Sequence, residues 1–116
     1  MSIEQWSDSV LLVKLADDPQ FSDDVHTLLE QCQGQTKFDV VLDFSEVTYL
    51  NSSNIALLLR LRKCVTDSNR RRLKLCCINS QVWGVFLVTG LDRLFDVAED
   101  VPSALASLQI QEDRTD

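Results

Sequence analysis

Hydrophobic and polar positions follow one another along this chain with two different periods. Short apolar runs bounded by turn residues predict β-strands over residues 10–15, 38–44, 73–78 and 94–98. Apolar positions spaced three or four apart predict amphipathic helices over residues 22–33, 52–68 and 80–88, with a last helix that opens at residues 100–102. Residues 3–6 can pair with the first strand as a hairpin. Strands that alternate with helices over short connections predict an α/β fold with a mainly parallel sheet.

Capping residues indicate where the helices begin and end. Ser22 and Ser80 are the expected N-caps of their helices, because a serine hydroxyl accepts a backbone N–H of the first turn. Gly34 and Gly90 are expected to end the same two helices, since glycine readily adopts the left-handed conformation found there. The strand over residues 38–44 is apolar on both faces, which predicts a sheet covered by helices.

The chain is long enough for one folded unit. Its 116 residues are 45% hydrophobic and 25% charged, which is typical of a single globular domain. We expect one domain over residues 1–116, with a polar tail from about residue 111. The longest apolar runs, 55–59 and 85–88, are far shorter than the roughly 18 residues that span a bilayer. Because the acidic N-terminus also lacks the features of a signal peptide, the expected location is the cytoplasm, without membrane contact.

The four cysteines are expected to be small buried hydrophobic residues. In the cytoplasm Cys32, Cys64, Cys76 and Cys77 should all be reduced. Their spacing matches no zinc motif. Adjacent residues of a strand point to opposite faces, so Cys76 and Cys77 are not expected to ligate one ion together. The sequence therefore predicts no metal site.

The charge distribution is uneven. The formal net charge is −7, but residues 60–74 hold seven of the 11 basic residues and carry +6, which leaves −13 on the rest of the chain. Basic side chains near the end of a helix complement its dipole. A basic stripe can also neutralise phosphates, but no aromatic residue is interleaved with this one for base stacking, and the acidic remainder disfavours nucleic acid. An acidic protein partner fits better, with a docking patch at Arg60, Lys63, Arg70 and Arg71.

Four small polar residues, Asn51 to Asn54, precede the second predicted helix. Asn51 or Ser52 can cap that helix. The same place suits a phosphorylated serine, because a phosphate carries about −1.5 to −2 charges and the N-terminus of a helix favours anions.

This region resembles the signature of STAS domains, in particular of bacterial anti-sigma-factor antagonists. The resemblance rests on Asp43-Phe44-Ser45, Val47, and Leu50 to Ile55. Residues 87–95 and then 104–105 are similar to the closing region of the same family, so the likeness extends over about residues 8–110. It implies a small, mainly parallel mixed sheet with about four helices packed mostly on one face.

The resemblance also implies a function. Members of this family are not enzymes and use no cofactor; they bind an anti-sigma factor, often a serine kinase, and so release a sigma factor. The kinase phosphorylates the antagonist, which then dissociates, and a serine phosphatase restores it. The family motif places the phosphate on Ser52, with Ser53 as second choice. The expected partner surface comprises Asn51, Ser52, Ser53, Asn54 and Leu57, preceded by a loop with Asp43, Ser45 and Glu46.

Two positions depart from the family motif Asp-Ser-Ser/Thr-Gly. Asn51 stands in place of the aspartate, and Asn54 in place of the glycine. Asparagine brings no negative charge, and Asn54 adds a side chain where glycine would leave space. These departures motivate an alternative, in which the chain is a STAS scaffold or interaction module that is not phosphorylated.

Other classes of function have weaker support. Asp17, Asp18 and Asp43 superficially resemble the magnesium site of a receiver-like signalling domain, but a receiver has a further strand and helix between these positions. The only histidine, His26, lies in a helix, and the three glycines are too widely spaced for a phosphate-binding loop. We therefore expect no enzymatic activity.

Overall fold

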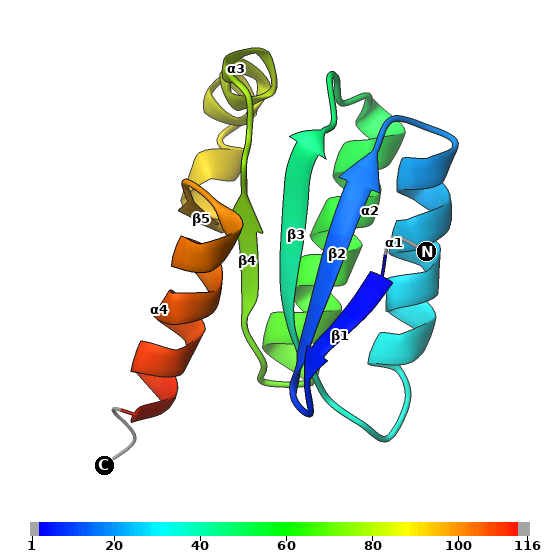
Figure 1. The fold of residues 1–116 in the computed structure, drawn as a ribbon. Coiled ribbons are helices and arrows are strands. Elements are labelled where there is room, and N and C mark those ends of the chain that lie inside the picture. The colour runs from blue at the N-terminus through cyan, green and yellow to red at the C-terminus, as the bar shows by residue number, and fades with distance from the viewer. Residues whose placement is uncertain (1–2, 114–116) are drawn as a thin grey trace.

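The computed structural model describes the backbone of residues 3–113 and the side chains of residues 3–108. In this part of the chain two consecutive strands are followed by a regular alternation of helices and strands, five strands and four α-helices together (Figure 1). The strands are β1 (Ile3–Ser7), β2 (Val10–Ala16), β3 (Asp39–Glu46), β4 (Leu73–Cys76) and β5 (Asp96–Ala98). The helices are α1 (Gln20–Cys32), α2 (Ser52–Arg62), α3 (Ser80–Thr89) and α4 (Val101–Asp113), with a π-helical segment (Lys63–Ser68) that continues α2 and a 3₁₀ turn (Leu91–Arg93) after α3.

The strands form one sheet in the order β1-β2-β3-β4-β5. β1 pairs with β2 in an antiparallel hairpin, whereas β2, β3, β4 and β5 are parallel neighbours. The predicted α/β class, the hairpin and the mixed, mainly parallel sheet are thus confirmed. Because each crossover returns the chain to the same end of the sheet, the loops that follow β2, β3 and β4 meet at one edge.

Helices cover both faces of this sheet, unequally. On β3, Val40, Leu42 and Phe44 join the main core with side chains of α1, α2 and α3, while Val41 packs with Ala104 of α4 on the other face. Figure 1 shows α1 and α2 side by side along the sheet, with α4 beside β4. This matches a strand that is apolar on both faces, as the sequence predicted.

The rotation of α2 about its axis differs from what its sequence indicates. A spacing of about 100° per residue over 52–68 predicts Leu59 on the apolar side of the helix and Leu57 at the edge of that side. In the structure Leu57 is only 8% exposed and Leu59 is 38% exposed. Nearly every residue from Ile55 to Leu61 is apolar, so periodicity alone did not decide which side faces the sheet. Packing of α2 against the sheet and beside α1 decided it.

Two predicted N-caps are misplaced, by about one turn in α1 and by one residue in α3. α1 begins at Gln20, so Ser22 lies inside its first turn and donates to Asp18 instead of capping the helix. α3 is capped by Asn79, whose side chain accepts from the N–H of Val82. In both places an aspartate or asparagine just upstream accepts a helical N–H, as caps commonly do.

Two of the cysteines are joined. Cys32, at the end of α1, forms a disulfide with Cys64 in the π-helical segment, and their Cα atoms are 6.4 Å apart. The expectation that all four cysteines are reduced is wrong for this pair in the structure. The two residues are 32 positions apart, so only the packing of α1 against α2 brings them together.

The C-terminal helix is longer than predicted. α4 continues to Asp113 and so includes the first part of the expected polar tail, while residues 114–116 lie outside the described part of the chain. Among residues 3–113, no helix has the length and apolarity needed to cross a membrane.

Candidate functional site

The polar residues singled out by the sequence gather at one edge of the sheet. The loop after β2 carries Asp17 and Asp18, and the loop after β3 leads to Asn51 and α2 (Figure 1). Both loops leave the carboxyl ends of parallel neighbours, where binding sites of open α/β sheets commonly lie.

Asn51 and Asn54 form a reciprocal cap at the start of α2. The side-chain oxygen of Asn51 accepts the N–H of Asn54 at 2.8 Å, and the side-chain oxygen of Asn54 accepts the N–H of Asn51 at 3.1 Å. The carbonyl of Asn51 also accepts the N–H of Ile55. This is a capping box with asparagine in both roles. Asn54, where the family motif has glycine, is therefore part of the turn that presents the serines.

Asp18 connects this cap to α1. One carboxylate oxygen accepts the N–H and the hydroxyl of Ser22, at 2.9 and 2.7 Å. The other accepts the side-chain amide of Asn54 at 3.0 Å and that of Asn51 at 3.4 Å. The hydroxyl of Ser22 and the amide of Asn54 stabilise the ionised form, so the pKa of Asp18 lies below its usual 3.8. A carboxylate thus stands next to the cap, although the motif position itself holds the uncharged Asn51.

Two further side chains hold the loop between β3 and α2. Asp17 accepts the N–H of Thr48 at 2.8 Å and also its hydroxyl. Asn79 donates its amide to the carbonyl of Val47 at 2.8 Å while it caps α3. Neither the residues of the family motif nor the hydrophobic pattern pointed to Asn79; an asparagine just before a predicted helix was the available signal.

Asp17 and Asp18 do not form the magnesium site of a receiver. Their carboxylates are occupied by N–H and O–H donors of Thr48, Ser22 and the two asparagines. The part of the chain that the structure describes brings no other carboxylate into a metal-binding group with them. They act as acceptors that fix the two loops to each other.

Ser52 and Ser53 occupy the first turn of α2 and are exposed. Within the described residues, neither hydroxyl has a hydrogen-bond partner, and no carbonyl or side chain accepts their backbone N–H groups. The first turn of a helix leaves such N–H groups free for an anion. Two exposed serine hydroxyls and two unbonded backbone N–H groups thus lie on a turn that the side chains of Asn51 and Asn54 hold in place.

The exposed side of α2 extends from these serines along the helix. Its members share exposure to solvent and recur along one side of the helix at intervals of three or four positions, some as adjacent pairs: Ser52, Ser53, Ala56, Leu59, Arg60 and Lys63. We call them the α2 stripe. Tyr49, just before the helix, is 46% exposed and adds an aromatic side chain that the motif analysis missed. Two residues of the predicted partner surface are not accessible to a partner: Leu57 lies in the core, and Asn54 is 1% exposed.

The predicted loop with Asp43, Ser45 and Glu46 is part of β3, which extends to Glu46. Ser45 and Glu46 are exposed, and Glu46 faces Lys14 across the strand pair at 3.8 Å. Asp43 accepts the N–H of Ser45 at 2.8 Å. The connection to α2 is thus shorter than expected and starts after Glu46.

The profile of the STAS domain covers residues 16–104 of this chain. The chain belongs to the STAS domain family. The match spans both loops of the site and the cap of α2, and the observed sheet and four helices agree with the family fold.

Solved structures with the fold of this STAS domain come from several kinds of protein. A serine-to-glutamate variant of RsbS from Moorella thermoacetica is 18% identical, with a TM-score of 0.81 over 96% of each chain. The anti-sigma factor antagonist SpoIIAA, unphosphorylated, is 15% identical, with a TM-score of 0.73 over 98% of this chain and 97% of that one. The phosphorylated form of this Bacillus protein is 16% identical, with a TM-score of 0.65 over 97% of each chain. A sulfate transporter family protein from Wolinella succinogenes is 14% identical, with a TM-score of 0.76 over 95% of this chain and 93% of that one.

At these identities the likeness shows a common fold. A comparison with curated protein sequences found no match.

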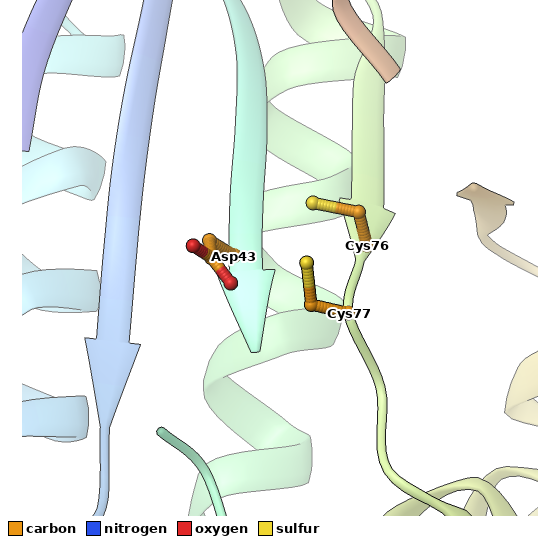
Figure 2. A group of neighbouring side chains, drawn as sticks. All are labelled: Asp43, Cys76 and Cys77. Carbon is orange, nitrogen blue, oxygen red and sulfur yellow. The ribbon is translucent and has the colours of Figure 1, made fainter. Parts of the chain in front are cut away.

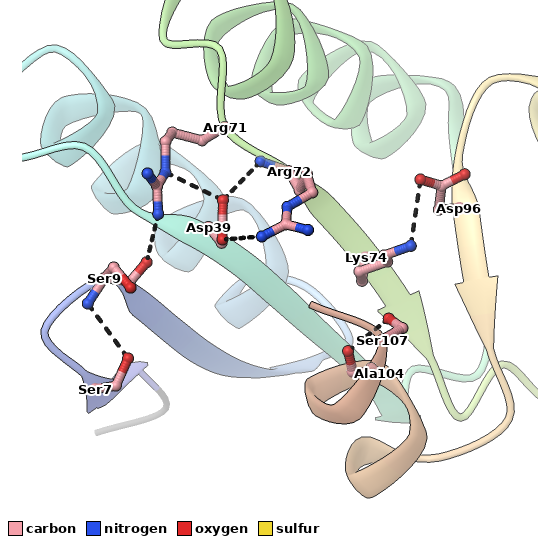
Figure 3. A network of polar contacts seen from close by, with 9 residues as sticks. All are labelled: Ser7, Ser9, Asp39, Arg71, Arg72, Lys74, Asp96, Ala104 and Ser107. Carbon is pink, nitrogen blue, oxygen red and sulfur yellow. Dashed lines mark hydrogen bonds and ion pairs between the residues drawn. The ribbon is translucent and has the colours of Figure 1, made fainter. Parts of the chain in front are cut away.

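Several of the basic residues at positions 60–74 of this STAS domain lie at the opposite edge of the sheet, where β3 and β4 begin. Arg71 and Arg72 precede β4 and both contact Asp39 at the start of β3, with N–O distances of 3.1 and 3.2 Å (Figure 3). Arg71 is therefore used within the fold, which corrects its place in the predicted docking patch. Arg70 is exposed near this edge, whereas Arg60 and Lys63 belong to the α2 stripe.

Proposed function

We propose that this STAS domain is an anti-sigma-factor antagonist that acts by partner switching, with Ser52 as its phosphorylated residue. The observation that carries the proposal is the first turn of α2, where a serine hydroxyl without a hydrogen-bond partner among the described residues sits on a rigid, doubly capped turn. The phosphorylated and unphosphorylated forms of SpoIIAA share this fold, which supports the proposal at the level of the fold.

The proposed partner is an anti-sigma factor that is itself a serine kinase. Its contact surface on this domain is the α2 stripe together with Tyr49. Tyrosine and leucine supply apolar area, and Arg60 and Lys63 favour an acidic partner surface. A serine phosphatase would reset the switch, and the domain itself performs no catalysis.

Phosphorylation would act through charge. The N–H groups of Ser52 and Ser53 favour a phosphate at this turn, so the modified domain stays folded. Asp18 is already ionised beside the cap, so the phosphate adds about −1.5 to −2 charges to an existing negative charge. A partner that fits the unmodified surface must then desolvate both groups. A loss of about 3 kcal/mol in binding free energy weakens the complex more than about 100-fold.

Asp18 also addresses the missing aspartate of the motif. Its carboxylate lies within hydrogen-bond distance of both asparagines, so negative charge is present at the cap although residue 51 is neutral. On this proposal Asp18 takes over the electrostatic part of the motif, while Asn51 retains the capping part.

The test combines phosphorylation mapping with binding. The domain is incubated with the candidate anti-sigma kinase, Mg²⁺ and ATP, and the phosphate is located by mass spectrometry in the wild type, Ser52→Ala and Ser53→Ala. Ser80→Ala is a matched control, because Ser80 is also an exposed serine that directly follows an asparagine N-cap. We expect Ser52→Ala alone to lose the phosphate.

Binding of Ser52→Glu and Ser80→Glu to the same kinase provides the second measurement. We expect Ser52→Glu to bind much more weakly than the wild type and Ser80→Glu to bind equally well. Phosphate that persists in Ser52→Ala would refute the assignment of Ser52. A stable complex without any phosphate transfer to the wild type would favour the alternative, an unmodified STAS scaffold.

A further inference from the structure

Three potential metal ligands converge on the face of the sheet that α4 covers. Asp43 of β3 and Cys76, the last residue of β4, are register partners on neighbouring strands, and Cys77 follows Cys76 (Figure 2). A carboxylate oxygen of Asp43 and the two sulfur atoms all lie within 4.8 Å of one another. Cys76 is fully buried among Val41 and residues of α4, and Cys77 is partly buried at the same place.

The backbone at Cys77 explains why neighbouring cysteines face the same way. The strand ends at Cys76, and Cys77 has a φ of +62°, in the left-handed region that residues with a side chain rarely adopt. Its N–H donates to the carbonyl of Glu99 at 3.2 Å. The alternation of side chains along a strand therefore does not apply to Cys77, which overturns the premise that excluded a shared ion.

We propose that Asp43, Cys76 and Cys77 form a binding site for a thiophilic divalent cation of the Zn²⁺ type. Two thiolates and one carboxylate are ligands that zinc accepts in tetrahedral sites, with Zn–S bonds of about 2.3 Å and Zn–O bonds of about 2.0–2.2 Å. The fourth position is left to water or to a ligand from a partner. This inference is independent of the phosphorylation proposed for Ser52.

The geometry requires only a small contraction. Tetrahedral bonds of about 2.3 Å place two sulfur ligands about 3.8 Å apart. The carboxylate oxygen and a sulfur ligand would lie about 3.6 Å apart, so the present atoms, at up to 4.8 Å, would have to approach by about 1.2 Å at most. Partial exposure of Asp43 and Cys77 leaves a route for the ion, while Cys76 is held from the side of the core.

The donor set selects against the common hard cations. Mg²⁺ and Ca²⁺ require about six or more oxygen ligands in rigid or spacious sites, and a single carboxylate offers at most two. Soft thiolates favour Zn²⁺ and its heavier analogue Cd²⁺. The bound divalent cation would also balance the charges of two thiolates and leave a net −1 with the carboxylate, in a site where Cys76 is out of contact with water.

The site is tested with the reduced full chain and with zinc alone. Equilibrium dialysis against Zn²⁺ gives the stoichiometry and affinity, and titration with Co²⁺ shows by its absorption spectrum whether thiolates are ligands. The variants are Asp43→Asn, which retains an acceptor for the N–H of Ser45, and Cys77→Ser. The control is Cys32→Ala with Cys64→Ala, which removes as many sulfur atoms as a loss of Cys76 and Cys77 would but leaves this site intact.

We expect one Zn²⁺ per wild-type chain and a Co²⁺ spectrum with a thiolate charge-transfer band. The affinity should fall more than about 100-fold in Asp43→Asn, because even changes outside the first ligand shell weaken binding about 10- to 100-fold. Cys77→Ser should lose intensity in the charge-transfer band, and the control should behave like the wild type.

Three results would overturn the site. These are zinc binding by the wild type no tighter than by the double variant Asp43→Asn/Cys77→Ser, unchanged affinity in Asp43→Asn, or loss of binding in the control. Far-ultraviolet circular dichroism of each variant shows that it is folded, and Asp43→Asn, the mildest change, remains informative if Cys77→Ser does not fold.

Discussion

Two aspartates organise opposite edges of this sheet, and their surroundings differ in charge. Asp39, at the start of β3, is 1% exposed and contacts the guanidinium groups of Arg71 and Arg72 (Figure 3). Asp18, after β2, accepts only from uncharged donors, namely Ser22, Asn51 and Asn54. No described cation forms an ion pair with Asp18.

The difference gives the two aspartates different roles: Asp39 stabilises the fold, whereas Asp18 lies at the candidate site. At Asp39 the buried carboxylate is paired with two arginines, so its negative charge is not available to a partner. At Asp18 the negative charge remains, beside two serine hydroxyls that are free to react. A hydrogen-bonded aspartate thus stabilises the fold at the edge that holds Asp39. At the edge that holds Asp18, a similar aspartate leaves an unpaired negative charge near two exposed serines.

The largest expected effect on stability is at Asp39. Asp39→Ala removes the partner of both arginines and the acceptor of the N–H of Arg72. We expect the free energy of unfolding to fall by about 3 kcal/mol, the low end for a broken buried pair, because both arginine side chains keep some exposure. Urea denaturation measures it. Glu46→Ala, which breaks the exposed pair with Lys14, is the control and should change stability by less than about 1 kcal/mol; equal losses would contradict the distinction.

Replacing Asp18 should lower the free energy of unfolding less than replacing Asp39, but it should also affect the proposed phosphorylation. Asp18→Ala leaves the buried amide of Asn54 without this acceptor and removes both bonds from Ser22. We expect a loss of about 2 kcal/mol in the free energy of unfolding. Exposed Asp23, in the first turn of α1, is the control, and Asp23→Ala should change stability by a few tenths of a kcal/mol to about 1 kcal/mol.

The phosphorylation proposed for Ser52 should distinguish these two edges more sharply than stability does. At a temperature where both variants are folded, Asp18→Ala should alter the rate of phosphate transfer to Ser52, whereas Asp39→Ala should not. Equal rates in the two variants would show that Asp18 serves the fold alone.

The contribution of Asp18 to the stability of the fold should be lost over a defined range of acidic pH. The hydrogen bonds from Ser22 and Asn54 lower the pKa of Asp18 below 3.8, so its contribution to stability is complete above about that pH. It is lost as the pH falls below 3.8 and through the lower pKa of the folded state. Unfolding curves of the wild type and Asp18→Asn between pH 5 and about pH 2 test this. The variant should lose less stability over this range; parallel curves would argue against the shift.

The smallest effect is expected at Ser52 itself. The hydroxyl of Ser52 has no bond to any other described residue, so Ser52→Ala should change the free energy of unfolding by no more than about 0.5 kcal/mol. Thermal unfolding measures it. A loss of 1 kcal/mol or more would mean that this serine supports the cap and is less available to a kinase.

Much of the fold followed from local patterns. The period of apolar residues placed the strands around 10–15 and 38–44 and the long helix from residue 52 close to where they lie. Such patterns work because helices and strands repeat with different periods and each must bury one side. They failed for Leu57 and Leu59, since an almost wholly apolar stretch has no unique buried side.

The candidate site was predictable only in part. Ser52 stands out through its motif and its place at the start of a helix, both of which are local. The hydrogen bond from Asn54 to Asp18 joins residues 36 positions apart, and no local signal relates the two. Similarly, the contact of Asp43 with Cys77 depends on one residue with positive φ, which a strand pattern does not reveal.

Sequence alone was sufficient for the α/β class, the likeness to STAS domains and the serine at the head of α2, because these depend on residues close together in the chain. The folded structure was needed for the rotation of α2, the charge beside its cap, the joining of Cys32 to Cys64 and the meeting of Asp43 with two thiols. Each of these depends on how distant segments pack, and packing is settled by the whole core rather than by any one stretch of residues.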